Sequence, residues 1–126
     1  MGQSFRDLVA WQRSIDLADA VYRLTRTFPP DERFGLTSQM RRAAVSVASN
    51  IAEGFGRTSR GEYVQSLGQA RGSNSEIETQ LVIGRRIDPE FREAESLTTE
   101  VGKILNGLIK SLRGSMGSRP RDLGSK

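Results

Sequence analysis

The sequence contains no cysteine and no histidine among its 126 residues. The absence of cysteine excludes disulfides, zinc–thiolate sites and thiol chemistry, and the absence of histidine removes the commonest general base and transition-metal ligand. Long hydrophobic runs are also missing, so we expect no membrane-spanning helix, and the N-terminus lacks the pattern of a secretory signal. We therefore expect a cytoplasmic, non-enzymatic protein with no metal, no cofactor and no membrane partner.

Charge is unevenly distributed along the chain. The formal net charge is +4, yet residues up to 112 are nearly balanced between basic and acidic side chains. The excess lies in residues 113–126, a stretch with little apolar content and no periodicity, which is typical of a disordered segment. This basic tail carries Arg113, Arg119, Arg121 and Lys126 against a single acidic residue, Asp122.

Apolar residues recur at spacings of three and four in four successive segments, which predicts four helices and no strands. Ser4 with Asp7 and Ser59 with Glu62 resemble capping boxes that open the first and third helices. Pro29 and Pro30, then Gly54 and Gly56, and finally Gly114 are expected to end the first, second and fourth helices. Because the connections are short, we predict an all-α, antiparallel up-down-up-down four-helix bundle over residues 1–112, followed by a disordered C-terminal tail over residues 113–126.

Each predicted helix has an apolar seam that we expect to face the core. In the first helix, Leu17, Val21, Leu24 and Phe28 are expected to widen this face. The seams are Leu8, Trp11, Ile15, Ala18 and Tyr22; Leu36, Met40, Ala43 or Ala44, Val47 and Ile51; Tyr63, Leu67, Ala70, Ile77 and Leu81; and Phe91, Ala94, Leu97, Val101, Ile104, Leu108 and Leu112.

The second and third helices also carry polar stripes separate from their seams. Such a stripe can be a solvated surface, a subunit contact or a ligand site, and its small, uncharged residues favour a subunit contact. We expect Arg42 to pair with Glu53 or Glu76, within or across this contact. The candidate contact residues are Arg42, Ser46, Ser49 and Glu53 on the second helix and Ser73 and Glu76 on the third.

Two features near the end of the second helix resemble catalytic or phosphate-binding elements, but simpler structural roles account for them. The amide of Asn50 is expected to cap neighbouring backbone or fix helix register through a buried hydrogen bond. Glu53 is expected to pair with Arg57 or Arg42, because a carboxylate near a helix C-terminus is otherwise unfavourable. The GFGRTSRG segment lacks the lysine and the final serine or threonine of a P-loop.

Arginine clusters make nucleic acid the more serious candidate ligand. With few aromatic residues, phosphate-directed binding is favoured over base stacking. The alternative is that these arginines pair with the equally numerous carboxylates. The candidate residues are Arg57 and Arg60 in the loop after the second helix, Arg41 within it, and Arg85 and Arg86 near the end of the third.

Four motifs resemble a known family in the same order along the chain. FRDLVAWQ, FPPDERFGL, QMRRAAVSVASNIAEGFGR and EYVQSLGQARGSNSEIETQL, between Phe5 and Ile87, are similar to the four-helix-bundle proteins encoded in intervening sequences of bacterial 23S rRNA genes. The resemblance implies a small antiparallel bundle and a ring-like homopentamer, and it extends distantly to accessory subunits of reverse transcriptases in diversity-generating retroelements. Two functions remain open: an oligomer that binds structured RNA or a ribonucleoprotein, and a scaffold or accessory subunit that contacts only proteins.

Overall fold

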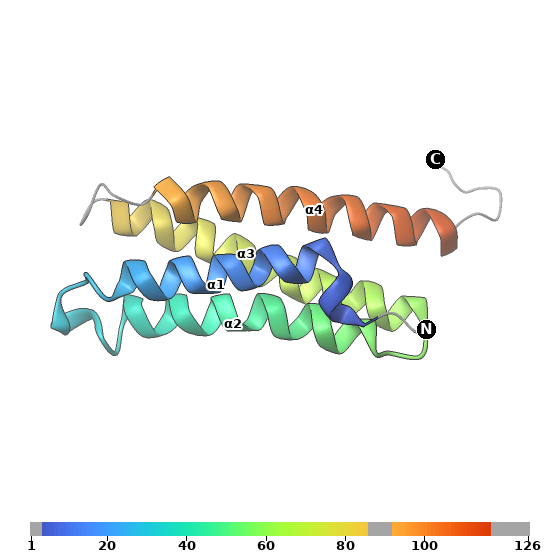
Figure 1. Cartoon of the computed structure of the whole chain (residues 1–126), viewed down its shortest axis with the longest axis horizontal. Coiled ribbons are helices and arrows are strands. Elements are labelled where there is room, and N and C mark those ends of the chain that lie inside the picture. Colours follow the sequence, from blue (N-terminus) through green and yellow to red (C-terminus); the bar gives the residue numbers. More distant parts are fainter. Residues whose placement is uncertain (1–3, 86–91, 117–126) are drawn as a thin grey trace.

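The computed structural model describes residues 4–85 and 92–116. This part of the chain is helical, as predicted, and forms four long helices that lie side by side (Figure 1). Contacts join each helix to the next and close the bundle between the first and the last. The helices are α1 (Val9–Thr25), α2 (Leu36–Phe55), α3 (Arg60–Arg85) and α4 (Arg92–Met116), with short 3₁₀ turns η1 (Phe5–Asp7) and η2 (Pro30–Glu32).

The predicted N-terminal capping box exists, but it opens η1 rather than α1. The Ser4 hydroxyl and the Asp7 carboxylate each accept a backbone N–H at this turn. The chain then becomes extended at Leu8, and α1 begins only at Val9. The turn is held against α1 by an edge-on contact between Phe5 and Trp11, whose ring centroids are 5.3 Å apart.

The first helix is shorter than its apolar pattern predicts. It ends at Thr25, whose hydroxyl donates to the carbonyl of Val21 at 2.7 Å. The chain then turns so that Phe28 is buried outside the helix, before Pro29 and the turn η2. Local bonding by Thr25 thus accompanies a helix end before the prolines are reached.

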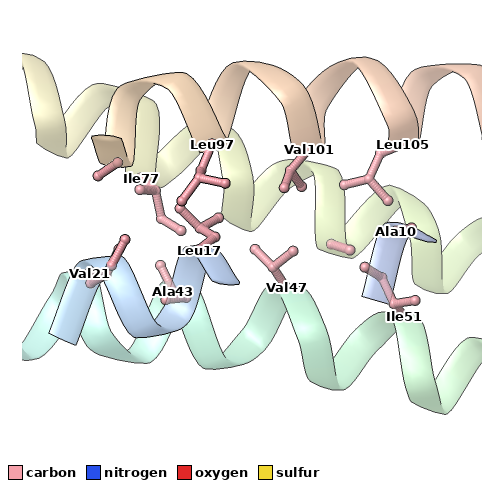
Figure 2. Packing of buried hydrophobic residues seen from close by; sticks show 14 of the residues in the cluster. Ala10, Leu17, Val21, Ala43, Val47, Ile51, Ile77, Leu97, Val101 and Leu105 are labelled. Carbon is pink, nitrogen blue, oxygen red and sulfur yellow. The ribbon is translucent and has the colours of Figure 1, made fainter. Parts of the chain in front are cut away.

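The core seams of α2 and α3 match the prediction, whereas the seam of α1 does not. Leu17 and Val21 point into the core shown in Figure 2, next to Ala10, and Ser14 on the same face is buried as well. The seam that the sequence predicted for α1 is offset from this buried face by about one residue around the helix, and its side chains are about half-exposed. The fully buried large side chains are Leu17, Val21, Met40, Val47, Ile51, Leu67, Ile77, Leu81, Val101, Leu105 and Ile109.

The last helix differs from the prediction in its seam and in its end. Leu105 and Ile109 are fully buried, and the expected seam residues Ile104 and Leu108 are only partly buried beside them. The helix continues to Met116, so Gly114 does not end it and the first residues of the predicted tail are helical. Phe91, expected at the start of this seam, lies outside the described residues.

Candidate nucleic-acid and subunit interfaces

Arg41, a candidate for phosphate contact, is engaged within the bundle. Its Nε donates to the Thr25 hydroxyl at 2.8 Å, and its guanidinium lies over the Tyr22 ring at 4.6 Å from the centroid. A further bond at 3.4 Å reaches the carbonyl of Tyr22 in the last turn of α1. A cation at a helix C-terminus is favourable, so Arg41 stabilises the junction between α1 and α2.

Arg85 is also engaged within the chain, through an ion pair with Glu95 of α4. This pair joins the end of α3 to the beginning of α4. Arg86, the remaining candidate in this region, lies outside the described residues. The interpretation that arginines pair with carboxylates therefore holds for Arg85.

Arg57 lies in the turn between α2 and α3, which follows the helix-ending residue Phe55, and Arg60 is the first residue of α3. The Ser59 hydroxyl accepts the backbone N–H of Glu62 at 3.1 Å, which is half of the predicted capping box. Arg57 is 48% exposed and lies 3.9 Å from a carboxylate oxygen of Glu53, as predicted for that glutamate. Such a long, exposed contact leaves the guanidinium of Arg57 accessible.

The four arginine candidates within the described residues do not form one patch. Arg41 lies near the start of α2 and Arg57 just beyond its end, roughly 24 Å apart at the helical rise of about 1.5 Å per residue. Arg85 ends α3, which runs back toward the start of α2 (Figure 1). The accessible candidates are thus at the end of the bundle that holds the α2–α3 turn, which we call the turn end.

Two of the six predicted subunit-contact residues contact each other inside one protomer. The hydroxyls of Ser46 and Ser73 are 2.9 Å apart across α2 and α3. The Asn50 amide donates to the Ser46 carbonyl at 2.9 Å and to its hydroxyl at 3.0 Å, both within α2, which matches the predicted bond to neighbouring backbone rather than the buried bond expected to fix helix register. Part of the polar stripe is therefore an internal seam between α2 and α3.

This internal seam continues at the turn end, where α2 and α3 approach closely. Ser66 of α3 is buried against Gly54. A Cβ atom at Gly54 would lie only 2.7 Å from the Ser66 Cβ, so no larger residue fits there without displacement. Tyr63 packs edge-on against Phe55 beside this contact, and burial raises the pKa of its phenol.

The other four residues of the predicted contact are exposed. They are Arg42, Ser49, Glu53 and Glu76. Within residues 4–85 and 92–116, Arg42 and Glu76 have no ion-pair partner, so the expected pairs of Arg42 with Glu53 or Glu76 are not present in the single chain.

Buried polar side chains on α3 are a feature that periodicity alone missed. Asn74 is 1% exposed and donates to the Thr98 carbonyl of α4 at 3.0 Å. Gln80 is 5% exposed. In the described part of the chain, the amide oxygens of both residues lack a hydrogen-bond partner.

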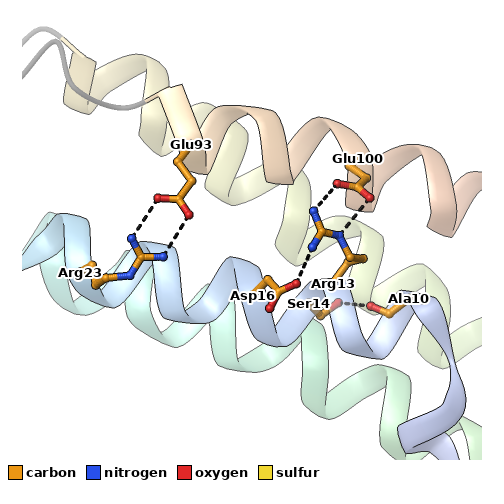
Figure 3. Close-up of polar contacts among 7 residues, drawn as sticks. All are labelled: Ala10, Arg13, Ser14, Asp16, Arg23, Glu93 and Glu100. Carbon is orange, nitrogen blue, oxygen red and sulfur yellow. Dashed lines mark hydrogen bonds and ion pairs between the residues drawn. The ribbon is translucent and has the colours of Figure 1, made fainter.

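Helices α1 and α4 are joined by two arginine–glutamate pairs (Figure 3). The fork of Arg23 donates to both oxygens of Glu93 at 2.9 and 3.0 Å, and Arg13 donates to both oxygens of Glu100 at 2.7 and 3.0 Å. Hydrogen bonding to these guanidinium groups lowers the pKa of both glutamates. No local pattern in the sequence predicts pairs between such distant segments.

The same arginines line an open groove of about 320 Å³ between α1 and α4. Asp16 and Asp19 on its rim also bond to Arg13 and Arg23, respectively. Each of these acidic groups is thus neutralised by a neighbour. Across the described ranges, no three His, Cys, Asp or Glu side chains are grouped as metal ligands.

None of the helices in residues 4–85 and 92–116 combines the length and the apolar character needed to cross a bilayer.

Comparison with known proteins identifies a family and a solved structure with a similar fold. Residues 6–107 match the model of the 23S rRNA-intervening sequence protein family. A solved structure from Bacteroides thetaiotaomicron VPI-5482, described as a protein of unknown function from the S23 ribosomal protein family, is 23% identical with a TM-score of 0.74. The match covers 81% of this chain and 99% of that one, and it supports the fold. No curated protein matches.

Proposed function

Because the chain belongs to the family of 23S rRNA-intervening sequence proteins, we propose that it is a non-enzymatic, homo-oligomeric helical bundle that binds structured RNA or a ribonucleoprotein in the cytoplasm. Binding is directed mainly at phosphates. The family resemblance implies a homopentamer, and the sequence and the described contacts offer no activated nucleophile or acid–base pair to support catalysis.

The observation that carries this proposal is the accessible arginine at the α2–α3 turn. Arg57 is 48% exposed with only a long contact to Glu53, and Arg60 follows in the first turn of α3. The helix dipole adds partial positive charge at the N-terminus of α3, which favours phosphate. The C-terminal part of α4, which carries Lys110 and Arg113, ends at the same end of the bundle (Figure 1).

Assembly strengthens this argument, because a ring repeats the turn end once in every copy. Several weak phosphate contacts on one particle act together when a structured RNA spans them. Without base-stacking aromatics around the turn, the affinity depends on charge and shape rather than on base sequence.

The proposal is tested by measuring RNA affinity as a function of salt for the full chain and for the double variant Arg57→Gln with Arg60→Gln. We expect the wild-type logarithm of affinity to fall with a slope of roughly 0.9 per neutralised phosphate for a duplex. The double variant should bind more weakly and with a shallower slope, because phosphate contacts are lost.

A matched control uses Arg26→Gln with Arg33→Gln, which removes the same charge from exposed arginines at the opposite end of the bundle. Equal losses in both double variants would indicate a general charge effect and remove the special role of the turn. Absence of any binding at low salt would contradict the RNA function itself.

A second candidate function, a protein-directed scaffold or accessory subunit, is favoured by Phe34. This ring is 89% exposed in the α1–α2 connection, an unusual position for a large aromatic side chain. Aromatic side chains of this kind often anchor protein contacts. A partner whose binding is lost in Phe34→Ala but insensitive to salt would support the scaffold over the RNA-binding function.

A further inference from the structure

Two rows of apolar side chains lie beside each other on α1 and α2, and we call these rows the α1–α2 groove. The α1 row consists of residues that the sequence predicted for the core, and the α2 row follows Arg41 at spacings of three and four residues. The contact of Arg41 with Tyr22 places the two rows beside each other. The rows are Trp11, Ile15, Ala18 and Tyr22 on α1 and Val45, Ala48 and Ala52 on α2; Ala48 is buried, and Trp11 and Ala18 are partly buried against the core.

This groove lacks a cover within the described residues. Ile15 is 41% exposed, Tyr22 36% and Val45 47%, although all three are large enough to be stabilising when buried. Helix α1 already has a complete core seam through Leu17 and Val21. A second apolar seam at heptad-like spacing is typical of a helix with a packing partner on its other side.

Helix α3 presents an outer face that carries two glycines. A Cβ atom added at Gly68 or Gly72 would meet nothing within 4 Å, so packing inside the protomer does not require either glycine. Both glycines lower helix stability relative to alanine. Further along α3, Ile83 is 51% exposed. The outer face therefore has small residues at one end and an exposed apolar residue at the other.

The charges beside the two surfaces are opposite in sign. Arg42 lies next to Val45 on α2, and Glu76 lies on the outer side of α3. Within residues 4–85 and 92–116 neither has an ion-pair partner. Between Gly61 and Gly84 the sole basic residue is Arg71, which donates to Asn106 on the α4 side.

We infer that the α1–α2 groove of one protomer seats the outer face of α3 from a second copy of this chain, with Arg42 paired to Glu76 of the partner subunit. The inference rests on the homo-oligomer of the proposed function and assigns its interface. Because the two surfaces are different, the contact is head-to-tail, and repeating it closes a ring when the rotation allows. Ser46 and Ser73, by contrast, are internal.

The first test compares the mass in solution of the full chain with that of Val45→Glu over a range of concentrations. A carboxylate buried without a partner is strongly unfavourable, so we expect Val45→Glu to weaken association at least about tenfold. The matched control is Val9→Glu. Val9 is 57% exposed, but it lies outside both proposed surfaces, and its substitution should leave the mass unchanged.

The second test identifies the partner surface by mixing Arg42→Glu with Glu76→Arg. Each variant alone places like charges at the proposed contact and should assemble poorly. In a mixture, every contact between unlike copies again joins opposite charges, so unlike copies should associate, with at least one like-charged contact left in a closed ring of odd number. A pair within one protomer would gain nothing from mixing, because each chain would keep its own repulsion.

The outcomes separate this inference from the proposed function. A wild-type chain that is monomeric at all concentrations would overturn the homo-oligomer itself. An oligomer that survives Val45→Glu would overturn the groove assignment alone. Dissociation by Val45→Glu without effect from Glu76→Arg would indicate a groove-to-groove contact and overturn the role of α3.

Discussion

The two helix pairs α2–α3 and α1–α4 are held together by different physical means. Across α2–α3 the contacts are short and uncharged: glycine against serine at Gly54 and Ser66, and hydroxyl against hydroxyl at Ser46 and Ser73. Across α1–α4 two long arginine side chains reach exposed glutamates, such as Glu93, at the surface. The first junction depends on shape, and the second depends partly on charge that solvent screens.

This difference has a consequence for function. A close, small-residue junction fixes the positions of α2 and α3, and with them the turn that carries Arg57 and Arg60. Preorganised cations lose less entropy when they bind a phosphate than cations on a loose loop do. The ion pairs of α1–α4 lie on another side of the bundle and are tolerant of small shifts.

The largest expected effect comes from adding one methyl group to the tight junction. In Gly54→Ala the new Cβ would overlap Ser66, 2.7 Å away, and overpacking of this kind typically costs about 1–3 kcal/mol. This loss should outweigh the helix-propensity gain of about 1 kcal/mol. Urea unfolding of the variant and the wild type measures the change.

The control is Gly107→Ala on α4, where an added Cβ meets nothing within 4 Å. It should stabilise the protein by up to about 1 kcal/mol. If both variants stabilise equally, the approach of α2 to α3 is not as close as described.

A smaller effect is expected from the hydroxyl pair. Ser73→Ala removes the partner of the Ser46 hydroxyl, which keeps its bond to Asn50, so we expect a loss of about 0.5–1 kcal/mol. Ser111→Ala removes an exposed hydroxyl from α4 and should change the unfolding free energy by less than about 0.5 kcal/mol. Equal effects in the two variants would show that the buried pair adds nothing to stability.

The sequence predicted the fold and the cores of α2 and α3, because those helices each have one dominant apolar stripe. On α1 two stripes compete, and periodicity favours the one with larger side chains, such as Trp11 and Ile15. Packing buries the other stripe, where Ala10 and Ser14 are small enough for the helices to approach.

The contacts of the candidate residues also divide into those that the sequence predicts and those that it does not. The contacts of Asn50 with Ser46 and of Glu53 with Arg57 are one helical turn apart, so their spacing predicts them. The partners of Arg41 and Arg85 belong to other helices, and helix rotation decides which side chains meet there. Unless the rotation of each helix is known, the sequence does not distinguish an accessible arginine from one that is paired inside the chain.

The smallest expected effect is a pH dependence of the charged junction. Hydrogen bonds from Arg23 and Arg13 lower the pKa of Glu93 and Glu100 in the folded state. A lowered folded pKa contributes stability that is fully present above the unfolded value of about 4.3 and is lost as the pH falls through the folded value. We therefore expect the urea concentration at the unfolding midpoint to decrease when the pH is lowered below about 4, and to decrease less in Glu93→Gln.

Glu78→Gln is the control, because Glu78 is exposed and has no ion pair within residues 4–85 and 92–116. An acid profile of Glu93→Gln that matches the wild type would mean that the pair with Arg23 adds no stability to the junction of α1 and α4.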